Sequence, residues 1–196
     1  MASPDRPDPR RTGPAPSSPD HVVLVGLMGS GKTTVGRLVA AHLGRPLVDV
    51  DVEVHERTGL TVNELWERGG EAAYRPLERD IVVHLLTVGG PDVLAMPGGA
   101  VDDELVLASL AGADAFTVWL RADPLELATR IERSGSHHRP LLGDDPLPVL
   151  EEQAAERDRT YSSLADLVLD VESRAPEDLA AAVEAALREH GAGGVS

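Results

Sequence analysis

The chain has 196 residues, of which 42% are hydrophobic and 3% aromatic, with no cysteine and a formal net charge of −15. This length suits one domain with a sizeable core, and the acidity argues against a nucleic-acid backbone as partner. The lack of cysteine excludes disulfides and thiolate metal sites, and no apolar stretch approaches the roughly 18 residues of a membrane span. We therefore expect a cytoplasmic globular protein without a membrane or nucleic-acid partner.

Residues 1–20 contain six prolines and several arginines, with no hydrophobic region after the charges. This composition predicts a disordered Pro-rich tail and not a signal peptide. We expect one folded domain over residues 21–190, followed by a frayed end at 191–196.

Strand-like and helix-like patterns alternate along that domain. The predicted strands are Val22–Gly26, Pro46–Val50, Asp92–Met96, Phe116–Leu120 and Leu167–Val171. The predicted helices are Lys32–Leu43, Val62–Arg68, Glu71–Val88, Asp103–Leu110, Pro124–Arg133, Pro148–Tyr161 and Pro176–His190. Such alternation indicates an α/β fold in three layers, with a five-stranded parallel sheet and helices on both of its faces.

The first strand runs into Gly-Leu-Met-Gly-Ser-Gly-Lys-Thr at residues 26–33, a complete phosphate-binding P-loop, and an amphipathic helix follows. Lys32 is the only lysine of the chain. Glycines let backbone N–H groups surround a phosphate, the lysine bridges two phosphates, and the threonine hydroxyl ligates Mg²⁺. We expect a nucleoside triphosphate to bind here. The candidate ATP-binding residues of this segment are Gly29, Ser30, Gly31, Lys32, Thr33 and Thr34.

An acidic pair, Asp49 and Asp51, ends the second predicted strand. Because they are two residues apart in an extended segment, both side chains should point to the same face. One of them can support the Mg²⁺ shell, through water, while the other addresses an acceptor hydroxyl. The third strand ends in Pro97-Gly98-Gly99 and not in the acidic residue of the large motor classes. The guanine-recognition sequence Asn-Lys-x-Asp of GTPases is also absent.

A long polar stretch rich in glycine and proline separates two predicted helices at about residues 134–147, with Arg139 in its middle. Loops of this length are often functional. We expect a mobile lid that closes over the phosphates.

These pieces together resemble shikimate kinase, of the nucleoside-monophosphate-kinase group of P-loop folds, from about residue 21 to residue 190. The matching motifs are the P-loop, Asp49-Val50-Asp51, Thr58-Gly59, the Gly-Glu…Tyr-Arg…Glu stretch at 70–78, Gly98-Gly99-Ala100-Val101, Arg139-Pro140-Leu141-Leu142 and Arg157-x-x-x-Tyr161. The resemblance implies a monomer that uses ATP and Mg²⁺ to phosphorylate shikimate to 3-phosphoshikimate in aromatic amino-acid biosynthesis.

The resemblance also implies roles for single residues. Asp51 would hold the acceptor hydroxyl and can deprotonate it. Arg75 and Arg157 would clamp the shikimate carboxylate, with the N–H groups of Gly98 and Gly99 completing the pocket. Lys32 and Arg139 would stabilise the transferring phosphoryl group, Thr33 and Asp49 would serve the metal, and two arginines would lie on the adenine side: Arg133 and Arg174.

Two prolines depart from the family pattern beside the proposed acceptor site. Pro97 replaces the first residue of a glycine triplet and lacks an N–H, and Pro76 follows Arg75 inside a predicted helix. Two alternatives stay open: a kinase of another small acid or polyol such as gluconate, and a nucleotide-binding regulatory module without turnover.

Overall fold

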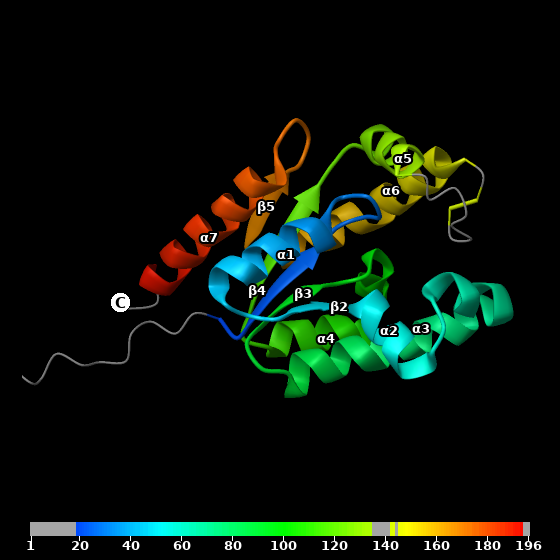
Figure 1. Cartoon of the computed structure of the whole chain (residues 1–196), viewed down its shortest axis with the longest axis horizontal. Coiled ribbons are helices and arrows are strands. Elements are labelled where there is room, and N and C mark those ends of the chain that lie inside the picture. The colour runs from blue at the N-terminus through cyan, green and yellow to red at the C-terminus, as the bar shows by residue number, and fades with distance from the viewer. Residues whose placement is uncertain (1–18, 135–141, 144, 194–196) are drawn as a thin grey trace, which may run out of the picture.

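Five parallel strands form the centre of the molecule in the order β2-β3-β1-β4-β5 (Figure 1). The computed structural model describes residues 19–134, 142–143 and 145–193. The strands are β1 (His21–Val25), β2 (Leu47–Asp49), β3 (Asp92–Ala95), β4 (Ala115–Arg121) and β5 (Leu167–Asp170). The predicted five-stranded parallel sheet is confirmed.

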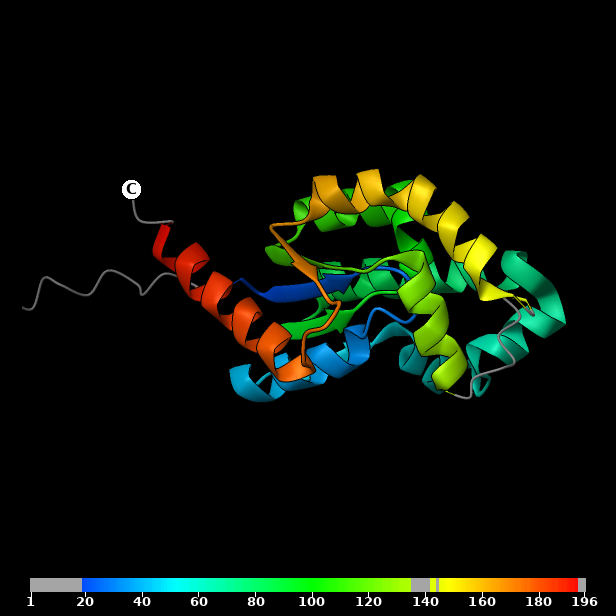
Figure 2. The same cartoon turned by 90° about the horizontal axis from the view of Figure 1, so that it is seen from above.

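Helices cover both faces of this sheet. They are α1 (Lys32–Leu43), α2 (Val50–Thr58), α3 (Val62–Val88), α4 (Glu104–Gly112), α5 (Pro124–Arg133), α6 (Pro146–Leu164) and α7 (Pro176–Gly193), with a short 3₁₀ helix η1 (Gly98–Asp102). Figure 2 shows α1 and α7 along one face and α4 and α6 along the other. Within the described residues, none of these helices is long and apolar enough to cross a membrane.

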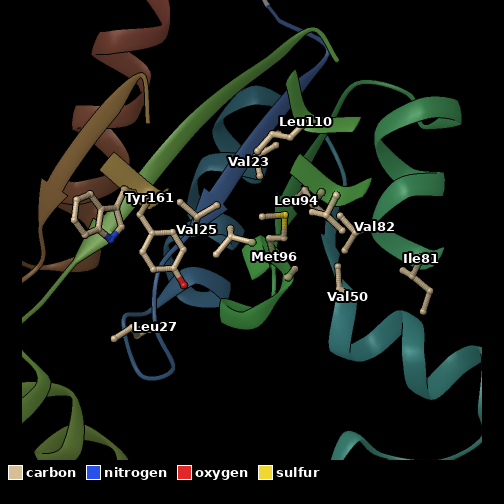
Figure 3. Close-up of a cluster of buried hydrophobic side chains, with 14 of the residues drawn as sticks. Val23, Val25, Leu27, Val50, Ile81, Val82, Leu94, Met96, Leu110 and Tyr161 are labelled. Atoms are coloured by element: carbon tan, nitrogen blue, oxygen red, sulfur yellow. The ribbon is translucent and has the colours of Figure 1, made fainter. Parts of the chain in front are cut away.

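The central strand β1 is buried on both sides, which explains its unbroken apolar sequence. Val22 and Leu24 pack into the cluster under α1 and α7, while Val23 and Val25 pack into the cluster on the opposite face. Figure 3 shows the second cluster, where side chains of the sheet meet those of α3 and α6. Alternate residues of one strand thus hold the two layers of helices in place.

The helix α2 was not predicted, and the predicted strand Pro46–Val50 is too long. Asp49 is the last extended residue, and its Oδ1 accepts a hydrogen bond from the N–H of Asp51, which caps α2. The residues after Asp49 alternate between valine and charged residues, which resembles an amphipathic strand. The cap and the left-handed Gly59 at the end of α2 are the local signals of the helix.

Helix α3 contains both helices predicted between residues 62 and 88. Its backbone leaves helical geometry at Gly70, with φ 61° and ψ −158°, between the two predicted segments. The predicted capping box is confirmed, because Thr61 and Glu64 bond reciprocally. Pro76 lies inside the helix, and no break is present at that residue.

Part of the predicted lid segment 134–147 is helical, because α6 begins at Pro146 and not at Pro148. Asp145 accepts from the N–H of Leu147, and proline is well suited to the first turn of a helix. Residues 135–141 and 144, Arg139 among them, lie outside the described residues.

We expect Leu94→Ala to lower the free energy of unfolding by roughly 2–5 kcal/mol, because a fully buried leucine leaves a cavity when truncated. Urea unfolding followed by circular dichroism measures this loss. The control is Leu105→Ala at an exposed position of α4, which should cost less than about 0.5 kcal/mol. Equal effects of the two substitutions would contradict the proposed core.

Candidate active site

The P-loop connects β1 to α1 at the carboxyl edge of the sheet. Gly26, Gly29 and Gly31 adopt positive φ angles of 140°, 84° and 93°. A Cβ on Gly26 would lie 2.5 Å from the carbonyl oxygen of Leu120 in the neighbouring strand β4. Only glycine therefore allows the loop to turn here and leave the start of α1 open to an anion.

Lys32 is held along the inside of the loop. Its Nζ donates to the carbonyl oxygens of Gly26 at 2.7 Å and Leu27 at 3.0 Å. These contacts fix an ammonium group beside the loop amides, where phosphate oxygens bind in such loops. Ser30 is buried, and its N–H donates to Leu27 O, so this predicted ATP-binding residue shapes the loop from within.

Thr33 and Asp49 face each other across the first turns of α1 and α2. The Thr33 hydroxyl donates to Asp49 Oδ2 at 2.6 Å, while Asp49 Oδ1 accepts from the N–H of Asp51. A hydroxyl and a carboxylate oxygen side by side are hard donors of the kind that Mg²⁺ prefers. The residues present therefore fit a magnesium ion.

Asp51 lies in the first turn of α2 and not in an extended segment, so the predicted reason for the alignment of the two aspartates is wrong. Both nevertheless line the cavity described below. Tyr74 Oη donates to Asp51 Oδ1 at 3.4 Å. Burial, together with the carboxylates of Glu78 and Asp51, raises the pKa of Tyr74 far above its ordinary value. The hydroxyl therefore stays protonated and available as a donor to Asp51.

Arg75 is oriented by two carboxylates of its own helix. Its Nε donates to Glu71 Oε1 and its Nη1 to Glu78 Oε1, each at 2.9 Å. Glu78 is 2% exposed, and burial raises its pKa while the Arg75 guanidinium opposes that rise. The guanidinium also packs on the rings of Trp66 and Tyr74, 6.0 and 5.8 Å from their centroids.

Gly99 is required for this position of Arg75. A Cβ on Gly99 would lie 2.2 Å from Arg75 Nη1 and 2.6 Å from Nη2. Because Gly99 has no side chain, its backbone can lie directly against the guanidinium of Arg75.

Arg157 and Tyr161 project from α6 toward η1, one helical turn apart. Tyr161 Oη donates to Gly98 O at 2.7 Å. The Nε and Nη2 of Arg157 contact the carboxylate of Asp102 at 2.7–3.1 Å. Helix α6 is therefore joined to η1 by two polar contacts between residues more than fifty positions apart.

A cavity of about 810 Å³ joins the P-loop to this arginine pocket. Its lining includes most of the predicted site residues: Gly29, Gly31, Lys32, Thr33, Thr34, Asp49, Asp51, Arg75, Gly98, Gly99 and Arg157. Pro97 forms part of the wall. The structure therefore brings the predicted nucleotide-binding and acceptor-binding residues together around one cavity.

The two arginines predicted on the adenine side do not line this cavity. Arg133 is exposed on the last turn of α5, and Arg174 is exposed in the segment between β5 and α7. Neither lines the cavity, whereas Arg130, one turn before Arg133, does. Arg130 Nε donates to Glu126, and its Nη2 donates to Val171 O.

Sequence reasoning assigned no role to Tyr74, Glu78, Asp102 or Tyr161, although each contacts a predicted site residue. The i, i+3 spacing of Arg75 and Glu78 on one helix was a usable signal. No sequence signal indicates the pairing of Arg157 with Asp102, because it depends on how two distant segments pack.

A phosphate-binding loop, an acidic pair and two arginines around one cavity at the edge of a parallel sheet define a P-loop kinase of small molecules. The family model of shikimate kinase matches residues 28–188. The shikimate kinase of Symbiobacterium thermophilum is 40% identical over 172 residues, covering 87% of this chain and 98% of that protein. The chain therefore belongs to the shikimate kinase family.

Solved structures agree with this assignment. A shikimate kinase from Acinetobacter baumannii in complex with shikimate aligns with a TM-score of 0.81 and 30% identity, covering 88% of this chain and 95% of that one. A gluconokinase from Sinorhizobium meliloti aligns with a TM-score of 0.54 and 18% identity, covering 90% and 95%. The second likeness concerns the fold alone.

We expect Gly26→Ala to abolish measurable ATP binding and to lower the free energy of unfolding by more than about 2 kcal/mol. The added methyl group would collide with Leu120 O at a backbone angle that alanine rarely adopts. Isothermal titration with ATP and urea unfolding measure the two effects. Gly44→Ala is the control, because Gly44 also has a positive φ but open space around it. It should cost about 1–2 kcal/mol and leave ATP binding intact. Unaltered ATP binding by Gly26→Ala would overturn this account of the loop.

Proposed function

We propose that this protein transfers the γ-phosphoryl group of ATP to the 3-hydroxyl of shikimate and so serves aromatic amino-acid biosynthesis. The observation that carries the proposal is the single cavity that joins Lys32 of the P-loop to Asp51 and to the two arginines. The A. baumannii relative, whose structure contains shikimate, supports this choice of acceptor.

Phosphoryl transfer requires little covalent help from the protein, but it does require alignment and positive charge around the transferred group. The P-loop amides and Lys32 bind the β- and γ-phosphates at the start of α1. The contacts of Lys32 with Gly26 O and Leu27 O hold the ammonium near this position before ATP arrives. The Lys32 side chain therefore needs to move little when ATP binds.

Thr33 would ligate Mg²⁺ directly and Asp49 would do so through water. A bound Mg²⁺ neutralises charge on the phosphate oxygens. The close pair formed by the Thr33 hydroxyl and Asp49 Oδ2 sets both oxygens at the phosphate side of the cavity.

Asp51 holds the acceptor hydroxyl and takes its proton. Tyr74, which donates to Asp51 Oδ1, limits the directions that this carboxylate can adopt. Arg75 and Arg157 bind the acceptor carboxylate from two directions, since arginine forks match carboxylate geometry. The backbone of Gly98 and Gly99 forms the wall between them, and Pro97 leaves this wall with one N–H fewer.

Three further arginines complete the proposal. Arg139 would approach the transferring phosphoryl group with the lid, and Arg133 and Arg174 would lie on the adenine side. We also propose that the enzyme acts in the cytoplasm and as a monomer, as the family resemblance implies.

A coupled assay of ADP release tests the function. We expect turnover with shikimate, ATP and Mg²⁺, and loss of kcat by roughly 10²-fold or more in Asp51→Asn and in Lys32→Ala. The reason is that the first variant lacks the proton acceptor and the second lacks the phosphate cation. The control is Asp80→Ala, an exposed carboxylate of α3 outside the cavity. Binding of ATP without any turnover on shikimate would reject the function and favour the regulatory-module alternative.

An acceptor panel separates the kinases. At equal concentration, kcat/KM for shikimate should exceed that for gluconate by at least about 10³-fold, because a site built for a given set of polar groups strongly rejects acceptors that leave them unpaired. A preference for gluconate would instead favour the other alternative, with Pro97 and Pro76 marking a change of acceptor.

Asp49→Ala should raise the Mg²⁺ concentration needed for half-maximal rate by roughly tenfold, because one outer ligand of the ion is lost. Titration of Mg²⁺ at saturating ATP measures this value, and the KM for shikimate serves as the internal reference. An unchanged Mg²⁺ requirement would restrict Asp49 to capping α2.

A further inference from the structure

Asp102 ends the 3₁₀ helix η1 and is not part of the cavity lining, whereas its partner Arg157 is. Its Oδ1 and Oδ2 lie 3.1 and 3.0 Å from Arg157 Nε, and Oδ2 lies 2.7 Å from Nη2. Such a pair of contacts fixes the plane of a guanidinium as well as its position.

The two partners differ in their exposure. The Arg157 side chain is 9% exposed and lines the cavity, whereas the Asp102 side chain is 48% exposed and does not line it. Asp102 therefore contacts the guanidinium along its Nε and Nη2 edge, and these contacts do not use Nη1. In the proposed site, Nη1 would be the nitrogen that meets the ligand carboxylate.

The same two elements are joined a second time. One turn further along α6, Tyr161 donates to Gly98 O at the start of η1. Arg157 thus stands on a helix whose distance from η1 is fixed, and its guanidinium is held at the far end of η1 by Asp102. The Arg75 guanidinium is also held by carboxylates, in its case those of Glu71 and Glu78 of its own helix.

We propose that Asp102 is a positioning residue that sets the affinity of the site for the acceptor carboxylate by orienting Arg157. The inference rests on the proposed function, in which Arg157 binds that carboxylate. Asp102 itself does not touch the acceptor or the transferred phosphoryl group, so its contribution is confined to acceptor binding.

A competing effect has the opposite sign. The negative charge of Asp102 repels an incoming carboxylate, so its removal could also tighten acceptor binding. This repulsion is weakened by solvent, because half of the Asp102 side chain is exposed. The orientation of a nearly buried guanidinium is not screened in this way. Orientation should therefore dominate, and the direction of the change in KM decides between the two effects.

Steady-state kinetics of Asp102→Ala test the inference. We expect the KM for shikimate to rise roughly tenfold while kcat and the KM for ATP stay within about twofold, as for loss of an interaction that serves binding alone. Asp102→Asn keeps one accepting oxygen but loses the negative charge, and it should give an intermediate KM. The matched control is Asp80→Ala, because Asp80 Oδ1 accepts from the same Nε and Nη2 edge of Arg79 outside the cavity. It should leave all three constants unchanged.

An unchanged or lower KM for shikimate in Asp102→Ala would overturn the inference. A lower kcat together with higher KM values for both shikimate and ATP, and a lowered melting temperature, would also overturn it. Such a result would indicate a structural role for Asp102. The wild-type enzyme is assayed first with shikimate. Absence of turnover at that stage rejects the proposed function together with the inference, whereas normal wild-type turnover with a wild-type KM in Asp102→Ala rejects the inference alone.

Discussion

The burial of β1 on both of its faces is the constraint on which the site depends. Every residue of His21–Val25 is buried, and parallel neighbours pair with β1 on each side. Because β1 is paired on both edges and buried on both faces, it holds the start of the P-loop at the carboxyl edge of the sheet. The close approach of Gly26 to Leu120 O then sets the direction in which the loop leaves the strand. The same edge receives Asp49 from β2 and the start of η1 after β3, so one packing arrangement assembles three parts of the cavity.

The chain has far fewer positive than negative residues, and several of its positive side chains line the cavity. With a net charge of −15, the chain orients its site arginines with its own carboxylates, Glu71 and Glu78 for Arg75 and Asp102 for Arg157. The Thr33 hydroxyl is also oriented by a carboxylate, because it donates to Asp49 Oδ2. Charged groups that are already aligned need little reorganisation when a ligand binds, and this is the main source of electrostatic stabilisation in such sites.

The two prolines beside the proposed acceptor site have different structural consequences. Pro76 stays within α3, whose only non-helical backbone lies at Gly70, so it does not displace Arg75 from the cavity. Pro97 adopts φ −58° and ψ 143°, which is ordinary for proline, and it precedes η1 in the cavity wall. The cavity wall therefore has backbone N–H donors at Gly98 and Gly99 and none at Pro97.

Local patterns in the sequence were enough to predict the parallel sheet, the P-loop, the division of α3 near Gly70 and eleven of the residues that line the cavity. These follow from local patterns: apolar runs, glycine spacing, capping residues and a complete phosphate-binding motif. The sequence did not determine α2, because valines that alternate with charged residues suit a strand as well as a helix, and the cap at Asp49 decided between them. It also did not reveal the contacts of Arg157 with Asp102 or of Tyr161 with Gly98. These contacts depend on the packing of α6 against η1, which brings together side chains more than fifty residues apart, and no local sequence pattern encodes that packing.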